Sequence, residues 1–297
     1  AFGATLSEKP FGLLLLGAGD EKDWKIVENA VALKASNRYP LEFAAGRADV
    51  KNIQKAIDRL QSKKARKIVA VPLFLGTNSE LMDQTRYLFG IRQAPSPEFF
   101  GSGRVSRPSL VRRVQSKVPL VLTQALDDQP VVVDVLTSRA LALSKGSAKE
   151  SVVLVSPAPS SEKAAEQWTQ TLNNLAERVR AKGGFKSAAA FLLDEDGRQS
   201  ARDKRREKFK AAVQKLSRHG PVLVVPFNLT ASDFARKIPR VLRGTFMRFD
   251  GKALLPDERI AAWVEETALA AVKLPDMRMF KDAGRALPKT TLKGALK

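Results

Sequence analysis

The sequence predicts an α/β protein of two doubly wound parallel-sheet lobes that are related by an internal repeat. Short apolar runs alternate with segments of helical periodicity, which is the pattern of parallel sheets with right-handed crossovers. One arrangement also occurs twice, at 66–83 and 220–237: an apolar run, then Pro-Leu-Phe or Pro-Phe-Asn, a polar loop and a helical pattern. Two copies of one unit predict two lobes with a cleft between them.

The first copy begins with FGLLLLGA at 11–18, a continuous apolar run that suits a strand buried on both faces. Further strands are expected at 40–46, 67–75 and 119–124. Helical spacing of apolar residues predicts the helices between and after them. These helices are expected at 21–36, 49–62, 79–89 and 129–144.

The second copy repeats this alternation after a polar segment, SKGSAK at 145–150, which is expected to be a flexible linker. Its expected strands are 151–157, 185–193 and 221–227, with a strand-like stretch around an Asp-Gly turn at 246–255. Its expected helices are 160–182, 201–217, 233–242 and 256–272.

These boundaries predict a first lobe over 10–145 and a second lobe over 151–272. The first lobe contains an insertion at 90–118 that is rich in Pro, Gly, Ser and Arg, with weak helical content near its end. Loops of that size inside compact domains are usually functional or mobile. Residues 273–297 mix Pro, Gly, Lys and Arg and are expected to form a loosely attached basic tail.

The composition restricts the chemistry. Lysine and arginine total 51 against 31 acidic residues, so the net charge is +20. Such a charge attracts nucleic acid, an anionic membrane or a small molecule with several carboxylates, although the even spread of the charges also fits a solubility role. The chain has no cysteine, which excludes disulfides, thiolate metal sites and cysteine nucleophiles.

The sequence leaves the compartment open. No apolar run approaches the roughly 18–20 residues of a membrane helix, so no transmembrane segment is expected. No signal peptide is evident, but the chain begins with Ala1 rather than Met. A soluble protein, either cytoplasmic or exported with a processed N-terminus, is the expectation.

Several strand-end motifs carry a resemblance to a known family. LGAGD at 16–20 resembles a strand end with the pattern Gly-His-Gly-Ser, AIDRL at 56–60 an intervening helix, and VPLFL at 71–75 a third strand. In the second copy, VPF at 225–227 and KIP at 237–239 match the third strand and the helix start that follows it. In this order the motifs resemble the sirohydrochlorin and cobalt chelatases, the CbiX-type or type II chelatases, in a tandem two-repeat form.

The resemblance implies six positions for metal-insertion residues, and none keeps the family residue. The family's histidines and glutamate fall at Ala18, Arg47 and Ser79 in the first copy and at Pro157, Leu193 and Asp233 in the second. Inserting a metal needs groups that ligate a divalent ion and remove pyrrole protons near neutral pH. Arginine stays protonated, and alanine and proline carry no such group. We therefore expect a degenerate chelatase-like protein without catalytic residues.

Carboxylates leave a second interpretation open. Asp20, Glu80 and Asp83 are expected near the mouth of the first sheet, and Asp83 matches a family aspartate that Lys237 replaces in the second copy. Carboxylates alone hold hard cations, so these acids and Asp233 are the candidates for an active sirohydrochlorin chelatase with Co²⁺ or Fe²⁺ as its substrate. Helix caps and solvent-facing acids explain the same residues, with Ser79 as an N-cap, and no resident metal or cofactor is expected.

Arginines suggest a ligand that remains after the metal chemistry is lost. The expected ligand-binding residues are Arg47, Asn78, Arg236, Arg240 and Arg243. Arginine binds carboxylates bidentately, and the tetrapyrroles of the family carry many carboxylates. The resemblance thus implies an anionic, planar molecule in the inter-lobe cleft.

Two other features indicate partners rather than chemistry. Dense basic runs at 202–210 and 63–67 fit a solvated helix face or an acidic protein partner, and the chain would then be a scaffold subunit of a larger assembly. No recognised nucleic-acid module accompanies them, so nucleic acid is not the expected partner. The single histidine, His219, precedes a strand at its amino end, whereas ligands of open α/β sheets bind at the carboxyl ends. We expect a surface or structural role for it.

Overall fold

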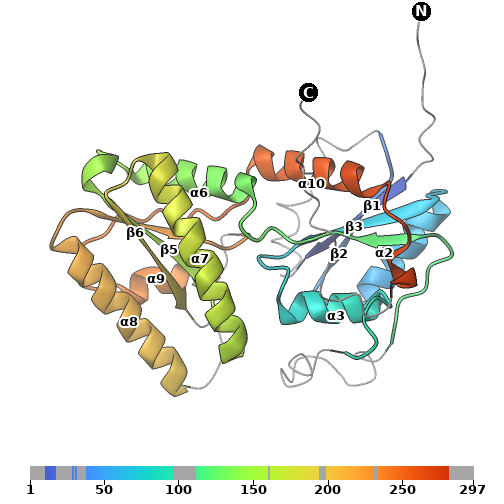
Figure 1. The fold of residues 1–297 in the computed structure, drawn as a ribbon, viewed down its shortest axis with the longest axis horizontal. Coiled ribbons are helices and arrows are strands. Elements are labelled where there is room, and N and C mark those ends of the chain that lie inside the picture. The colour runs from blue at the N-terminus through green and yellow to red at the C-terminus, as the bar shows by residue number, and fades with distance from the viewer. Residues whose placement is uncertain are drawn as a thin grey trace, which may run out of the picture.

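The computed structural model describes residues 11–17, 29, 31, 38–95, 112–159, 161–193, 199–230 and 233–280. They form two α/β lobes, each built on a parallel sheet (Figure 1). The predicted fold class is confirmed. The helix expected at 21–36 and most of the insertion lie outside the described residues.

The first sheet has the strand order β2-β1-β3-β4, and every pair is parallel. Its strands are β1 (Phe11–Gly17), β2 (Leu41–Ala45), β3 (Lys67–Leu73) and β4 (Leu120–Leu122). Helices α2 (Val50–Ser62) and α3 (Glu80–Leu88) follow β2 and β3. All residues of β1 are buried, as its uninterrupted apolar run predicts for a central strand.

The second sheet repeats the arrangement with the order β6-β5-β7, again all parallel. Its strands are β5 (Ser151–Pro157), β6 (Ser187–Leu193) and β7 (Val222–Pro226). Helices α7 (Glu162–Gly183), α8 (Gln199–Ser217) and α9 (Asp233–Val241) follow them in turn. In both lobes the first strand is central and the next two flank it, as an internal repeat requires.

Two helices cross between the lobes. Helix α6 (Pro130–Leu143) leaves the first sheet after β4 and packs on α7 and β7 of the second lobe. Helix α10 (Glu258–Ala271) follows the second lobe in sequence but packs on β3 and α6 (Figure 1). Because each lobe borrows a helix from the other, the division into 10–145 and 151–272 stays a prediction.

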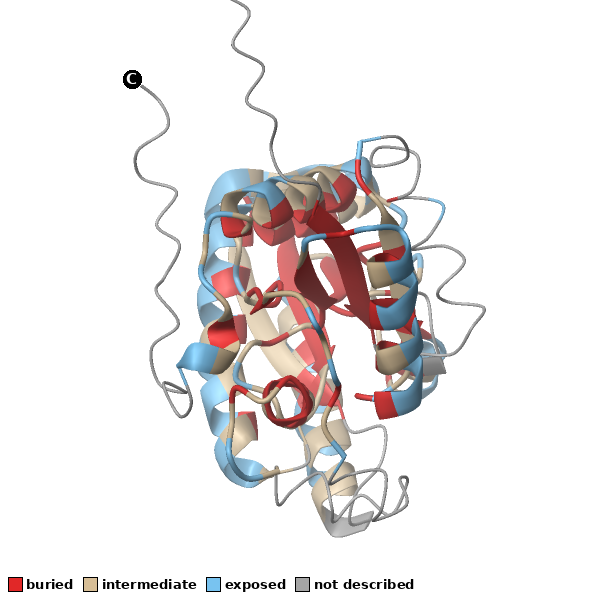
Figure 2. Ribbon diagram, turned by 90° about the vertical axis from the view of Figure 1, so that its right-hand side faces the viewer, coloured by how far each residue is buried: buried red, intermediate tan, exposed pale blue. Residues whose placement is uncertain are grey.

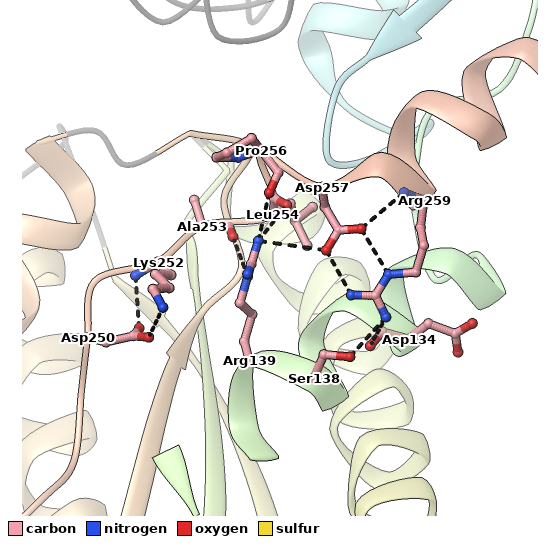
Figure 3. A network of polar contacts seen from close by, with 10 residues as sticks. All are labelled: Asp134, Ser138, Arg139, Asp250, Lys252, Ala253, Leu254, Pro256, Asp257 and Arg259. Carbon is pink, nitrogen blue, oxygen red and sulfur yellow. Dashed lines mark hydrogen bonds and ion pairs between the residues drawn. The ribbon is translucent and has the colours of Figure 1, made fainter. Parts of the chain in front are cut away.

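Two arginines join the crossing segments (Figure 3). Arg139 of α6 donates to the backbone carbonyls of the segment that enters α10, those of Ala253, Leu254 and Pro256. Arg259 donates to the Asp134 carbonyl and the Ser138 hydroxyl of α6, at 3.1 and 2.9 Å. Asp257 caps α10 and accepts from the Arg259 guanidinium at 2.7 and 2.8 Å. The network fixes α10 against α6.

One apolar core cluster extends through both lobes, and a second cluster is confined to the second lobe. One cluster of buried side chains includes Leu15 and Val71 of the first sheet together with Leu154 and Val225 of the second. Figure 2 shows the buried residues concentrated on the strands and on the inner faces of the helices. A shared core predicts that the lobes unfold together.

The segment 145–150 is ordered, and the prediction of a flexible linker is wrong. It contains the 3₁₀ helix η1 (Ser147–Lys149), and Glu150 is 2% exposed. The Glu150 carboxylate accepts from the Ser144 hydroxyl, the Lys145 amide and the Arg248 guanidinium. The polar sequence at this point therefore reflects a buried carboxylate with its hydrogen-bond donors rather than a flexible linker.

The stretch 246–255 forms no named strand, contrary to the prediction. Arg248 makes a single parallel bridge with Leu223, supported by backbone hydrogen bonds to Val222 and Val224. The chain then turns at Gly251, which has a φ of +73°. One bridge is all that the turn allows before the segment leaves the sheet.

The first part of the expected tail is docked rather than loose. Lys67 donates to the carbonyls of Val272 and Leu274 at 2.6 and 2.8 Å. Arg278, in the 3₁₀ helix η2 (Met277–Met279), donates to the carbonyls of Ser116 and Val118. The prediction of loose attachment is therefore wrong for 273–280, and 281–297 lie outside the described residues.

Glu150→Ala is expected to lower the free energy of unfolding by about 2–3 kcal/mol, because Arg248 and the Lys145 amide lose a buried acceptor. Urea denaturation measures the loss. Asp128→Ala is the control: it removes a carboxylate that is 50% exposed and paired with Arg178, and it should cost less than about 1 kcal/mol. Equal losses in the two variants would contradict the role of Glu150.

Acid is expected to destabilise the protein through Asp257. Burial raises the pKa of this carboxyl, but hydrogen bonds from Arg259 and the charge of Arg139 more than offset burial, so the pKa lies below its ordinary 3.8. A depressed pKa gives stability that is complete above the unfolded-state value and is lost as the pH falls through the folded one.

The free energy of unfolding should therefore decrease as the pH falls below about 4. The decrease should be smaller in Asp257→Asn than in the wild type. Urea midpoints at a series of pH values measure this difference. Identical acid dependence in the two proteins would show that the interactions of Asp257 with Arg259 and Arg139 do not stabilise the folded state.

Candidate functional site

The first-lobe candidates follow three strands that end side by side. Gly17, Ala45 and Leu73 are register neighbours at the carboxyl edge of the first sheet. Ligands of open α/β sheets bind at this edge. Ala18 and Asp20, which follow Gly17, lie outside the described residues.

Arg47 stands on a tight turn after β2. Gly46 and Ala48, on either side of it, have φ values of +113° and +52°. Asp49 then caps α2 by accepting from two backbone amides, and the Asn52 side chain donates to the Ala45 carbonyl at 2.9 Å. The turn exposes Arg47, and no carboxylate of the described residues pairs with its guanidinium.

Ser79 acts as the N-cap of α3. Its hydroxyl accepts from the Met82 amide at 3.2 Å, which confirms the capping interpretation. Asn78, directly before it, is exposed. Ser79, at the position of the family's second histidine, thus caps a helix, while the side-chain amide of Asn78 is exposed to solvent.

Both oxygens of Asp83 are held by arginines. Oδ1 lies 2.8 Å from the Arg86 guanidinium and Oδ2 lies 2.8 Å from that of Arg92. Arg86 is 8% exposed, so its charge stays beside this carboxylate. Glu80 begins the same helix, one turn earlier. Within the described ranges, no group of three histidines or acids is arranged to hold a metal ion.

Asp127 is a structural carboxylate that the sequence reasoning missed. It accepts from the Thr77 amide at 2.7 Å and from the Thr77 hydroxyl, and that hydroxyl in turn accepts from the Ala125 amide at 2.8 Å. Burial raises the pKa of Asp127, and the Thr77 hydrogen bonds only partly offset it. The contacts tie the loop after β3 to the loop after β4. An Asp-Asp pair just after an expected strand was the available signal.

Apolar residues occupy two family positions of the second lobe. Pro157 and Leu193 are the last residues of β5 and β6 and are register partners, and Leu193 is fully buried. Neither can ligate a metal or accept a proton. Asp233 begins α9, and its side chain lies outside the described residues.

The second-lobe arginines do not gather at the carboxyl edge. Arg236 lies in the first turn of α9, whereas Arg240 lies in its last turn and Arg243 beyond it. Soon afterwards, Arg248 bonds to Val222 at the amino end of β7. Arg240 and Arg243 therefore lie toward the opposite edge from Arg236, and their role in ligand binding stays a prediction. His219 is exposed in the turn before β7, as expected.

Trp168 connects the strand ends of the two lobes. Its ring stacks on Phe227, with centroids 5.7 Å apart, and its indole N–H donates to the Ser156 hydroxyl at 3.0 Å. A Cβ placed on Gly76, in the loop after β3, would lie only 3.2 Å from the ring. Periodicity had placed Trp168 among the apolar residues of a helix, and no local pattern paired it with Gly76.

Solved structures share the two-lobed α/β fold of this chain. SirB from Bacillus subtilis with Fe³⁺ superposes with a TM-score of 0.61 at 16% identity, over 90% of this chain and 99% of that one. This is the chelatase fold. SirB from Bacillus subtilis subspecies spizizenii in complex with cobalt follows, with a TM-score of 0.55, 14% identity and the same coverages.

A third likeness is to a larger protein. DR2241 from Deinococcus radiodurans, described as a multi-domain protein with structural similarity to chelatases, gives a TM-score of 0.51 at 17% identity. The match covers 88% of this chain and 54% of DR2241. No family model and no curated protein matches the sequence. The likeness is therefore one of fold, and the chemistry has to be argued from the residues.

Gly76→Ala is expected to destabilise the protein by about 1 kcal/mol, because the new methyl group pushes against the Trp168 ring. In a Trp168→Ala background the same change should cost almost nothing, so a double-mutant cycle isolates the contact. Urea denaturation of the four proteins measures it. An equal cost in both backgrounds would place the strain elsewhere than at Trp168.

Proposed function

We propose that this chain is a degenerate chelatase-like protein that binds an anionic, planar or multi-carboxylate molecule and inserts no metal. Its fold is that of proteins whose structures hold Fe³⁺ and cobalt. The proposal rests on what stands at the family's positions, and above all on the pairing of Asp83 with two arginines.

The Asp83 site disfavours a metal ion on electrostatic grounds. A divalent ion would have to displace Arg86 and Arg92 from the carboxylate, each at 2.8 Å, and would then lie among their charges. Arg47 adds a positive charge at the same edge of the sheet, after β2, which is separated from β3 by β1. Pro157 and Leu193 supply no ligand from the second lobe. This set of groups suits an anion better than a cation.

Arg47 is the residue best placed to bind such an anion. It is exposed, no carboxylate of the described residues pairs with its guanidinium, and a tight turn presents it at the carboxyl edge. Arg236 and Asn78 are secondary candidates, since they lie in or next to the turns that follow β7 and β3. The Trp168 ring, which is partly exposed, offers aromatic surface, while Phe227, on which it stacks, is fully buried.

Binding is tested by titrating the protein with uroporphyrin, a porphyrin polycarboxylate, and following the Soret band and tryptophan fluorescence. A saturable shift is expected, and Arg47→Ala should weaken it about tenfold, the loss of one charge-assisted hydrogen bond. Arg66→Ala is the matched control, because it removes an equally exposed arginine at the amino end of β3. No shift, or equal weakening in both variants, would contradict the proposed site.

Metal insertion is tested separately with sirohydrochlorin and Co²⁺ or Fe²⁺. The proposal predicts the uncatalysed rate. Turnover above that rate that is lost in Asp83→Ala would establish the alternative, an active chelatase that uses carboxylates with the metal ion as substrate.

A further inference from the structure

One aromatic side chain of the second lobe points outward. Phe246 is 87% exposed, in the turn that follows α9. Its neighbours Met247 and Phe249 pack against the second-lobe core, so the chain here has apolar residues that it does bury. Gly244, with a φ of +80°, shapes the turn.

A depression lies beside this ring. It is open, has a volume of about 610 Å³ and separates the end of α8 from the turn. The residues that line it are Gln214, Ser217, Arg218, Gly244, Thr245 and Phe246. The hydroxyls of Ser217 and Thr245 donate to nearby backbone carbonyls, at 2.8 and 2.6 Å. The Arg218 guanidinium and the Gln214 amide are therefore the polar groups with which a bound partner would interact.

The surroundings carry one sign of charge. From Lys208 to Arg248 the sequence has nine lysines and arginines against one acid, Asp233. Four of these cations are exposed and lie in the lining or within a few residues of it in sequence, with no carboxylate of the described residues paired to them. They are Lys215, Arg218, Arg240 and Arg243.

This surface, defined here as the Phe246 face, is separate from the candidate ligand site. Helix α8 ends at the outer side of the second lobe, away from the first lobe (Figure 1). The turn after α9 returns to the amino end of β7, where Arg248 bonds to Val222. The carboxyl-edge loops lie at the other end of the same strands.

We propose that the Phe246 face docks an acidic protein segment that carries apolar side chains. The exposed Phe246 ring can insert between side chains of a partner, and the depression beside it can receive one of the partner's side chains. Exposed Phe and Arg are also typical anchors of protein interfaces. A bilayer surface has no counterpart to the hollow. A nucleic-acid strand would stack on successive aromatic rings, and the lining of this face includes one.

The test uses the full chain and a short fluorescein-labelled peptide of glutamates with interspersed leucines, followed by fluorescence anisotropy. The comparison probes are an all-glutamate peptide, vesicles of phosphatidylserine with phosphatidylcholine, and oligothymidine. The leucine-containing peptide should bind most tightly. Phe246→Ser and Arg218→Ala should each weaken it about tenfold, because both remove an anchor.

Lys204→Ala is the control, since it removes one exposed charge from the other end of α8 and should change binding less than about twofold. Thermal unfolding checks that each variant folds. Absence of peptide binding, equal binding by wild type and Phe246→Ser, or tighter Phe246-dependent binding of vesicles or oligothymidine would each overturn the proposal. Uroporphyrin binding should be unchanged in these variants, so the two proposals fail independently.

Discussion

Trp168 stacks on Phe227, donates to Ser156 and lies against Gly76, so one side chain holds the strand ends of both lobes in place. The exchanged helices α6 and α10 keep the lobes in register around it. Parallel strands place their following loops at one edge, and this contact brings the loop after β3 to the end of β5. What the molecule can bind at that edge depends on the few side chains that these loops expose.

The proposed anion site rests on those side chains. The Asp83 carboxylate is paired with Arg86 and Arg92, while Arg47 is exposed on a tight turn and is paired with no carboxylate of the described residues. The second lobe contributes Pro157 and Leu193, which are chemically inert. The fold is shared with proteins whose structures hold iron and cobalt, while the charges that surround Asp83 here are those of two arginines.

Much of this could be predicted from the sequence, because buried parallel strands read as apolar runs and helices as periodic ones. The strand expected at 67–75, which ends at Leu73, and the cap at Ser79 are local features, and both were predictable. Other contacts join residues far apart in sequence: Trp168 with Gly76, Glu150 with Arg248, and Arg278 with the Ser116 carbonyl. No local pattern encodes such pairs, so the sequence wrongly predicted a flexible linker and a loose tail. Arg240 and Arg243 lie in the last turn of α9 and beyond it, because the helix runs away from the edge at which Arg236 lies.

The most direct test of this account is equilibrium dialysis of the purified chain against Co²⁺, with the d–d absorption of the bound ion as a second readout. If arginines and apolar residues have replaced the ligands, the protein should retain no stoichiometric Co²⁺ at micromolar concentrations and show no protein-bound spectrum. Tight retention of one ion per chain, lost in Asp83→Ala, would contradict the account.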